Sequence, residues 1–367
     1  MPLKFNLHCT DGGARRGSVE TAHGTFQTPA FMAVGTAATV KALTMAQVAD
    51  TGTEVILGNT YHLMMRPGGD LVEQMGGLHK FSGWRGPILT DSGGFQVMSL
   101  GALTKMSEQG AQFTSHIDGG IKHLLTPEKS VQIQHQLDSN ITMVLDECLH
   151  LPAPRDRVEK NIDLVARWAR RSRDAFIDRP GYGIFGIVQG ADQKDLRLKS
   201  AADLTSIGFD GYAIGGLAVG EPQEIMFDMI AHTTPALPAD RPRYLMGVGT
   251  PLDILGAVER GIDMFDCVMP TRAGRTAQAF TAHGTINLRN AKFRDDPTPL
   301  NSHCNLSLAY IHHLVKCNEI LAATLLTQHN LYFYQDLMHE IRLAIERGNF
   351  LQFKKEFTEK YTGGSNA

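Results

Sequence analysis

Eight short apolar runs, each ending in glycine or polar residues, constrain the fold of this 367-residue chain more than any other feature. Apolar runs of this length that lack alternation are typical of strands buried on both faces, as in a parallel sheet. Helical patterns separate most of the runs. The runs are AFMAVGT (30–36), EVILGNT (54–60), PILTDSGG (87–94), ITMVLDEC (141–148), YGIFGIVQG (182–190), GYAIGGLAVG (211–220), RYLMGVG (243–249) and DMFDCVMP (263–270).

Several of the intervening segments carry helix signals. Thr126-Pro127 and Thr250-Pro251 each combine a hydroxyl cap with proline at the first helical position. The segment 154–176 repeats apolar residues at helical spacing. Strand–helix alternation repeated eight times predicts an α/β fold, a (β/α)8 TIM barrel. The alternative, a doubly wound open sheet, would need a glycine-rich phosphate turn after the first strand, whereas Gly35 is followed by TAATVKAL.

Two segments fall outside the barrel pattern. Residues 97–125 form a long insertion after the third run, and it contains the segment MSEQGAQ. Residues 271–367 form a C-terminal extension of mostly helical pattern, including LAYIHHLVKCNEILAATLL. We therefore expect a barrel with an N-terminal extension over residues 1–270 and a C-terminal subdomain over residues 271–367.

The composition argues for a protein of the cytoplasm. The opening MPLKFNLHCT lacks the apolar core of a signal peptide, and no run is long enough to cross a membrane. The five cysteines are scattered and form no CxxC motif, so we expect no disulfide framework. The net charge of −3 carries no overall nucleic-acid signal, so a nucleic-acid partner would require a local basic face.

Polar residues mark the ends of the runs, and the loops at the strand ends of a barrel converge on one active site. Burying several carboxylates at one rim is costly, so their convergence indicates function, although any single one could be a helix cap or a turn residue. Two carboxylates can share acid/base and nucleophilic roles at an anomeric carbon. Phe95 could stack on a flat ring together with Met246, and the loop PTRAGR could hold phosphates. The spacing therefore predicts a glycosyl-transferring or glycosyl-hydrolysing barrel acting on a phosphate-bearing substrate. The polar residues and glycines at the run ends are Asn59, Asp91, Asp146, Gln189, Gly215, Gly216, Gly247 and Asp266.

Seven motifs resemble the bacterial queuine tRNA-ribosyltransferase (tRNA-guanine transglycosylase) family, and the resemblance runs from about residue 3 to about residue 360. They are LGNTYHL (57–63), LTDSGGFQ (89–96), DEC (146–148), GIVQG (186–190), GYAIGGLAVGE (211–221), YLMGVG (244–249) and FDCVMPTRAGR (265–275).

The resemblance implies exchange of guanine at the first anticodon position of tRNAs with a GUN anticodon for 7-aminomethyl-7-deazaguanine, a queuosine precursor. It implies that Asp266 is the nucleophile that forms a covalent tRNA intermediate, and that Asp91 is the general acid/base. It also implies that Thr271, Arg272 and Arg275 bind the tRNA, since residues 260–294 hold six Lys/Arg against two Asp/Glu. The implied base-binding residues are Asn59, Phe95, Asp146, Gln189, the Gly216 backbone, the Leu217 carbonyl and Met246.

The chain departs from the family pattern in its C-terminal extension. The family carries a zinc subdomain with three cysteines and a histidine, whereas the matching positions here hold Thr298, Leu300, His303 and His329. Threonine and leucine cannot replace two thiolates on zinc, so either the metal is lost or a shifted set binds it. The candidates for a shifted set are His303, Cys304, Cys317 and His329. In the family, the zinc subdomain helps to form the homodimer and approaches the tRNA. We therefore expect loss of the metal to affect both the homodimer that the resemblance implies and the affinity for tRNA. A smaller departure is Ala191, where the family has glycine.

Three other functions fit parts of the pattern. A non-catalytic tRNA-binding paralogue would account for the altered zinc positions, although decay should remove pocket residues first. A relative could act on a different deazaguanine or nucleic acid. A plain glycoside hydrolase would leave the base-binding set without a role.

Overall fold

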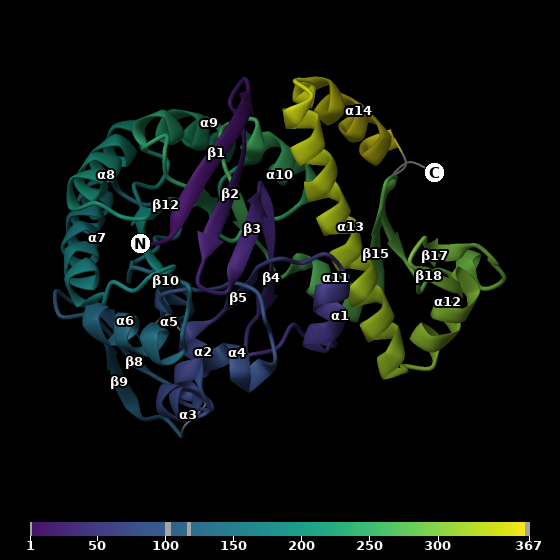
Figure 1. Cartoon of the computed structure of the whole chain (residues 1–367), viewed down its shortest axis with the longest axis horizontal. Helices are drawn as coiled ribbons and strands as arrows, with labels where there is room; N and C mark the ends of the chain where they lie inside the picture. The colour runs from purple at the N-terminus through teal and green to yellow at the C-terminus, as the bar shows by residue number, and fades with distance from the viewer. Residues whose placement is uncertain (1, 100–103, 116–118, 364–367) are drawn as a thin grey trace.

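The computed structural model describes residues 2–99, 104–115 and 119–363, and its centre is a closed barrel of eight parallel strands (Figure 1). Each predicted run contains one of these strands, so the TIM barrel is confirmed. Met264 pairs with Ala30, which closes the last strand onto the first. The strands are β4 (Ala30–Gly35), β5 (Ile56–Gly58), β6 (Ile88–Thr90), β10 (Ile141–Met143), β11 (Gly183–Val188), β12 (Gly211–Ile214), β13 (Arg243–Leu245) and β14 (Met264–Asp266).

Helices surround the barrel, and the predicted start signals are present. The Thr126 hydroxyl accepts the Lys129 N–H at 3.1 Å, and the Thr250 hydroxyl accepts the Asp253 N–H at 3.2 Å. The long helix α7 (Arg155–Ala175) occupies the predicted segment. The other helices between the strands are α1 (Met45–Asp50), α2 (Thr60–Met65), α3 (Gly69–Gln74), α4 (Gly77–Ser82), α5 (Gly94–Met98), α6 (Pro127–Gln136), α8 (Lys194–Ile207), α9 (Gln223–Thr233), the short η2 (Thr234–Ala236) and α10 (Pro251–Val258).

Two small antiparallel sheets are added to the barrel. The N-terminal extension forms β1 (Lys4–Asp11), β2 (Ala14–Thr21) and β3 (Gly24–Thr28). Arg15 of β2 reaches the carboxylate of Asp263, just before β14, at 3.1 Å, so this sheet is tied to the end where the barrel strands begin. The described part of the insertion forms β7 (Thr104–Met106), β8 (Ala111–Thr114) and β9 (Lys122–Leu125), a sheet that the sequence analysis did not predict.

The C-terminal extension is mostly helical, as predicted, but it also contains two hairpins that the apolar pattern did not indicate. Among the residues described, no helix is both long and apolar enough to cross a bilayer. The elements are α11 (Met269–Arg275), β15 (Gln278–Thr281), β16 (Gly284–Asn287), η3 (Ala291–Phe293), β17 (Pro299–Asn301), β18 (Cys304–Ser307), α12 (Leu308–Lys316), α13 (Ile320–Glu346) and α14 (Phe350–Gly363).

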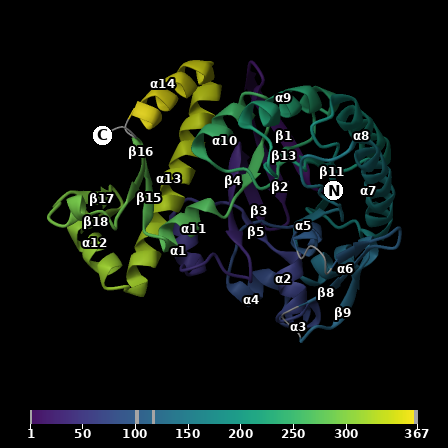
Figure 2. The ribbon, with the colours of Figure 1, turned by 180° about the vertical axis from the view of Figure 1, so that it is seen from behind.

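Helix α13 joins the extension to the barrel and contacts both β4 and α11 (Figures 1 and 2). Its buried residues Leu337 and Ile341 belong to the same apolar core as the barrel strands. The Tyr334 hydroxyl donates to the Gly249 carbonyl at 2.6 Å, and the buried Asn330 amide donates to the Pro270 carbonyl at 2.9 Å. The boundary between residues 270 and 271 falls inside α11, and a separate C-terminal subdomain stays a prediction.

Candidate active site

A cavity of about 340 Å³ opens where the barrel strands end, and it brings together most of the residues singled out in the sequence. Gln189 lies next to its wall, because its amide donates to the Asp146 carboxylate at 2.8 Å. The predicted residues that line the cavity are Asn59, Asp91, Phe95, Asp146, Gly216, Leu217, Met246 and Asp266.

Asp91 follows β6 and is the most heavily hydrogen-bonded carboxylate of the cavity. One oxygen accepts the Asn59 amide at 2.5 Å and the Gln96 amide at 2.7 Å. The other accepts the backbone N–H groups of Thr60 at 2.8 Å and Gly93 at 3.2 Å. Burial nevertheless raises the pKa of Asp91, and these four donors oppose the rise. The network holds the carboxylate in one orientation and stabilises its charged form against the effect of burial.

Asp266 ends β14 and has one oxygen held and one oxygen available. Its Oδ1 accepts the Tyr244 hydroxyl at 2.5 Å and the Gly247 N–H at 2.7 Å. Among the described residues, Oδ2 has no hydrogen-bond donor. Burial raises the pKa of Asp266, Tyr244 and Gly247 lower it, and the charge of Asp91 raises it further. Such a carboxylate is suited to attack an electrophilic carbon.

Asp146 faces the same cavity from the loop after β10. Besides the Gln189 amide, it accepts the Ser92 hydroxyl at 3.2 Å. Burial raises the pKa of Asp146 to about 6, the two hydrogen bonds oppose this rise, and the charge of Asp91 adds to it. The carboxylate is therefore charged at neutral pH and can accept hydrogen bonds from a ligand.

The loop after β12 forms a backbone wall of the cavity. Gly216 has φ of +64°, and a Cβ there would lie 2.5 Å from the Gln189 amide oxygen, so the wall requires glycine at this position. Glu221 accepts the backbone N–H groups of Ala218 and Val219 and fixes the far end of the loop. Phe95 is half-exposed and offers an apolar surface to the cavity.

Sequence reasoning did not single out Tyr244, Gln96, Thr60 or Ser92. Each donates a hydrogen bond to a carboxylate of the cavity: Tyr244 from β13, Ser92 from the loop after β6, Thr60 from the start of α2 and Gln96 from α5. Gln96 lies within the motif LTDSGGFQ, which was its one signal in the sequence.

The three predicted tRNA-binding residues lie on α11, directly after β14. Thr271 is buried, Arg275 is partly buried and Arg272 is exposed. The Arg275 guanidinium donates to the Thr271 carbonyl at 2.8 Å. None of the three lines the cavity, so any contact that they make with a ligand lies outside it.

The queuine tRNA-ribosyltransferase family model matches residues 9–363. The chain belongs to this family. It is 55% identical to the queuine tRNA-ribosyltransferase of Ruegeria sp. (strain TM1040) over 368 residues. This alignment covers 99% of the chain and 98% of the relative. The chain is 59% identical over 343 residues to that of Gluconacetobacter diazotrophicus, covering 92% and 88%. The Zymomonas mobilis relative is 54% identical over 369 residues, covering 98% and 95%. Membership of this family makes the chain a pentosyltransferase of tRNA modification.

The residues at the family's zinc positions do not fit a zinc ion. Leu300 is buried in an apolar cluster of the C-terminal extension. His329 uses both ring nitrogens: Nδ1 faces the Asn301 amide at 2.6 Å, and Nε2 faces the Phe280 carbonyl at 2.7 Å. Asn301 Oδ1 accepts the His303 N–H at 2.8 Å, so its amide nitrogen must donate to His329. The neutral ring then donates from Nε2 and has no lone pair left for a metal.

The shifted set is not gathered in the described structure either. The His303 ring stacks on Tyr332 with centroids 4.0 Å apart. Cys317 is exposed, and its sulfur lies 3.8 Å from the His313 ring. In the described residues, these four side chains form no group with metal-ligand spacing, so zinc binding by the shifted set stays a prediction.

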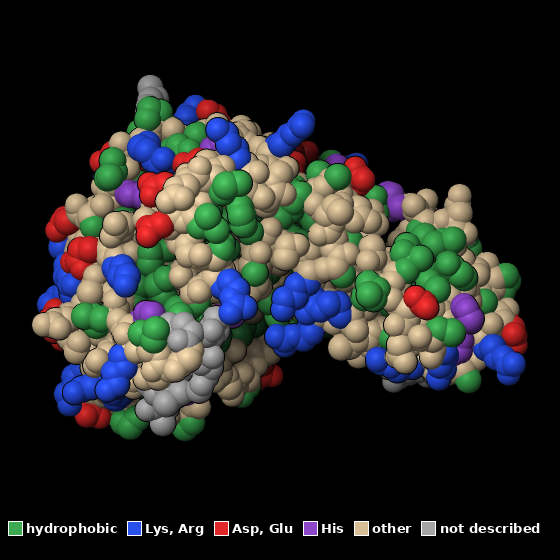
Figure 3. Space-filling model, turned by 90° about the horizontal axis from the view of Figure 1, so that it is seen from below, with side chains coloured by type: hydrophobic (Ala, Val, Ile, Leu, Met, Phe, Trp, Pro, Cys, Tyr) green, Lys and Arg blue, Asp and Glu red, His purple; other side chains and the backbone are tan. Residues whose placement is uncertain are grey.

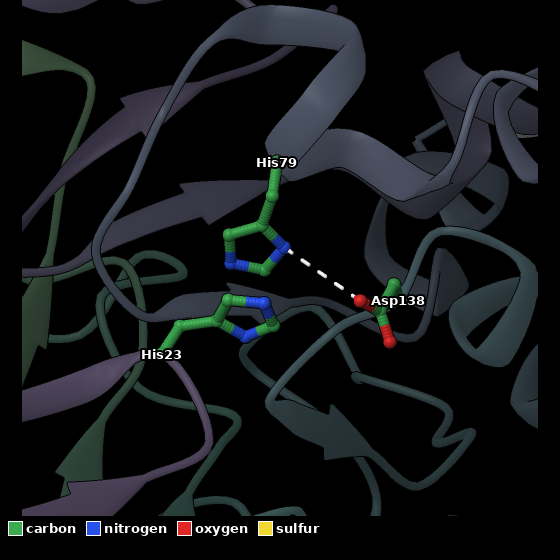
Figure 4. A group of neighbouring side chains, drawn as sticks. All are labelled: His23, His79 and Asp138. Carbon is green, nitrogen blue, oxygen red and sulfur yellow. Dashed lines mark ion pairs between the residues drawn. The ribbon is translucent and has the colours of Figure 1, made fainter.

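Elsewhere in the described residues, one group of three side chains has metal-ligand spacing, namely His23, His79 and Asp138 (Figure 4). Its geometry does not suit a metal. The two imidazole rings are stacked 3.6 Å apart at 13°, so no ion can lie in the plane of both. The Asp138 carboxylate already pairs with Arg179 at 3.0 Å and accepts the Tyr182 hydroxyl at 2.9 Å. The cluster connects the β2–β3 turn to α4 and to the loop after α6.

Two further features noted in the sequence are Ala191 and the insertion 97–125. Ala191 has φ of +54° and packs against α7 and α8 without lining the cavity, so its methyl group shapes the turn and does not narrow the cavity. The insertion 97–125 follows the third barrel strand. Its residues 97–99 directly follow the cavity-lining Gln96. Among its described residues, none of 97–99, 104–115 or 119–125 lines the cavity. Residues 100–103 and 116–118 lie outside the description.

We predict that Tyr244→Phe raises the pKa of the Asp266 carboxyl by about one unit, because the charged carboxylate loses one of its two donors. Titration of carboxyl carbons by NMR on selectively labelled protein measures the shift. Tyr334→Phe is the control, since its hydroxyl donates to the Gly249 carbonyl instead of a carboxylate. An unchanged Asp266 pKa in Tyr244→Phe would contradict this account of the hydrogen bond.

Proposed function

We propose that this protein exchanges guanine at the wobble position of GUN-anticodon tRNAs for 7-aminomethyl-7-deazaguanine, through a covalent ribosyl intermediate on Asp266. The observation that carries the proposal is the convergence of Asp91, Asp146 and Asp266 on one cavity at the mouth of the barrel. Each carboxylate has a different set of donors, so each is suited to a different role. The names of the relatives, queuine tRNA-ribosyltransferase, agree with such a reaction.

Asp266 acts as the nucleophile in this proposal. Its free oxygen attacks C1′ of the ribose, a C–O bond forms, and the C1′–N9 bond breaks with its electron pair going to guanine. Tyr244 and Gly247 hold the other oxygen, so the attacking oxygen keeps a fixed direction. Asp91 gives a proton to the departing base and takes one from N9 of the incoming base, which then displaces Asp266 from C1′. The raised pKa of Asp91 suits a group that must pass through both protonation states.

Base recognition falls to the opposite side of the cavity. The Asp146 carboxylate accepts the N–H groups at N1 and the 2-amino group of guanine. Gln189, which is hydrogen-bonded to Asp146, and the Gly216 backbone bind the remaining polar edge of the base. The Leu217 carbonyl accepts a hydrogen bond from the aminomethyl group of the incoming base. Phe95 and Met246 offer apolar surfaces for stacking. Asn59 orients Asp91 by the hydrogen bond between them.

The tRNA backbone is held by the basic residues after β14. Arg272 is exposed and Arg275 is partly exposed, and the Arg275 guanidinium donates to the carbonyl of the buried Thr271. Figure 3 displays Lys and Arg side chains gathered where the C-terminal extension joins the barrel, the junction at which Figure 2 labels α11. Positive charge at this junction supports phosphate binding beside a base turned into the cavity. The homodimer implied by the resemblance remains part of the proposal.

The first test is incorporation of labelled guanine into an unmodified tRNA transcript with a GUN anticodon. The wild type should incorporate it and form a protein–RNA adduct that survives denaturing gel electrophoresis. Asp266→Asn should lose at least about a thousandfold in rate and lose the adduct, because the nucleophile is gone. Asp253→Asn is the control, since it removes a carboxylate of α10 that does not line the cavity. Binding of tRNA by the wild type without incorporation would favour a non-catalytic tRNA-binding paralogue.

We further predict that affinity for free guanine falls on acidification. The pKa of Asp146 is raised to about 6, so its acceptor form is lost as the pH falls through that value. Affinity at pH 5 should be about tenfold below that at pH 7.5, measured by calorimetry. Asp266→Asn should keep this dependence, whereas Asp146→Asn should bind weakly with little dependence between pH 5 and pH 8. A flat profile for the wild type would remove Asp146 from base recognition.

We also propose that the C-terminal extension folds without zinc. The apolar packing of Leu300 and the hydrogen bonds of His329 occupy the space and the donors that a metal would use. Protein purified from zinc-supplemented medium should contain much less than one zinc per chain by elemental analysis. Excess EDTA should leave the thermal unfolding midpoint unchanged. One tightly bound zinc per chain, with an EDTA-dependent drop in the midpoint, would contradict the proposal.

A further inference from the structure

Arg197 of α8 is a fully buried arginine that lies behind the wall of the cavity. Its guanidinium donates to three backbone carbonyls. Nε reaches Ala191 at 2.7 Å, Nη1 reaches Gly215 at 3.2 Å and Nη2 reaches Gly216 at 3.3 Å. One side chain therefore connects the loop after β11, which carries Gln189, with the loop after β12, which carries Gly216.

The charge of Arg197 is unusual for such a buried place. In the described parts of the chain, no carboxylate lies within ion-pair distance of it. Burial lowers the pKa of Arg197 to about 10, and the more distant charge of Glu221 opposes this, so the side chain remains a cation at neutral pH. Burying a cation whose direct hydrogen-bond partners are all neutral carbonyls is costly, and an apolar side chain could fill the same space. The cost suggests a role in addition to packing.

Peptide geometry connects Arg197 to the cavity. The carbonyl and the N–H of a trans peptide point in opposite directions, and the peptides of this loop are trans. Because Arg197 holds the carbonyls of Gly215 and Gly216, the N–H groups of Gly216 and Leu217 point away from Arg197. Gly216 and Leu217 both line the cavity. The two N–H groups are thus aimed at the cavity side of the wall.

We propose that Arg197 is a positioning residue for base recognition, which orients and polarises the Gly216 and Leu217 N–H groups so that they bind the 6-oxo group of guanine. The inference rests on the proposed function. A cation on a carbonyl strengthens the N–H of the same peptide as a donor. When the C1′–N9 bond breaks, the negative charge of the departing base spreads to its 6-oxo group, and fixed donors there stabilise it without reorganisation.

The test compares guanine with 6-thioguanine, which keeps N1–H and the 2-amino group but offers a weaker acceptor at position 6. Dissociation constants of both bases are measured by calorimetry for the wild type, Arg197→Met and Arg197→Lys. The wild type should prefer guanine. Arg197→Met should lower this preference by about tenfold, and Arg197→Lys, which keeps the charge but loses the fork, should fall between the two. In the exchange assay, the KM for guanine should rise while the KM for tRNA stays unchanged.

Arg243→Met is the matched control. Arg243 is also buried, and it donates to the Leu237 carbonyl at 3.1 Å from the first residue of β13, at the opposite end of the barrel. It should lose stability while keeping the wild-type preference between the two bases. If Arg197→Met does not fold, the preference of Arg197→Lys decides, and a wild-type value there would overturn the inference.

The possible failures can be told apart. A wild type that binds guanine, with the same preference in the folded Arg197 variants, would overturn only the role of Arg197. A wild type that binds neither base would contradict the proposed function, and the inference with it. An equal loss of preference in Arg243→Met would reduce the effect to general destabilisation and overturn the inference.

Discussion

Three carboxylates share one small cavity, and the need to stabilise their burial organises the rest of the site. A buried carboxylate is tolerated only where donors surround it. Asp91 has four donors from two segments, residues 59–60 and 93–96, whereas Asp146 and Asp266 have two donors each. The closed barrel brings these donors together, because all eight strands end at one rim and the loops that follow them lie next to one another. The placement of the donors then distinguishes Asp91 and Asp146, which have both oxygens held, from Asp266, which has both donors on one oxygen.

The sequence was sufficient to predict the barrel and the carboxylates, because both depend on local patterns. Doubly buried strands give apolar runs, and polar residues at their ends must lie at the mouth. The donors were harder to predict. Tyr244 lies in an apolar run and looks like a core residue, yet its hydroxyl reaches Asp266. Arg197 lies in a helix whose pattern gives no sign that its charge is buried. Such pairings depend on which strands become neighbours, and a single sequence does not state that.

In the C-terminal extension, too, the sequence predicted the local structure better than the contacts between distant residues. Its mostly helical character follows from the apolar pattern and was predicted, but β15 to β18 are short strands of two hairpins with little alternation. The departure from the zinc motif was visible in the sequence, whereas the contacts that the residues at these positions make were not. A buried leucine and a histidine with two hydrogen-bond partners now occupy the region, and only the fold shows that Asn301 and the Phe280 carbonyl are those partners. Apolar packing and neutral hydrogen bonds both contribute to the stability of this hairpin.

Helix α13 has a consequence for how the chain is made. It packs against β4, the first strand of the barrel, yet it begins at residue 320, more than fifty residues after the last barrel strand, β14, ends. During synthesis, all eight strands leave the ribosome while the apolar surface that will receive Leu337 and Ile341 is still bare. The barrel of a nascent chain therefore stays incompletely covered until nearly the whole polypeptide has emerged, and over that interval it presents the kind of surface that chaperones bind.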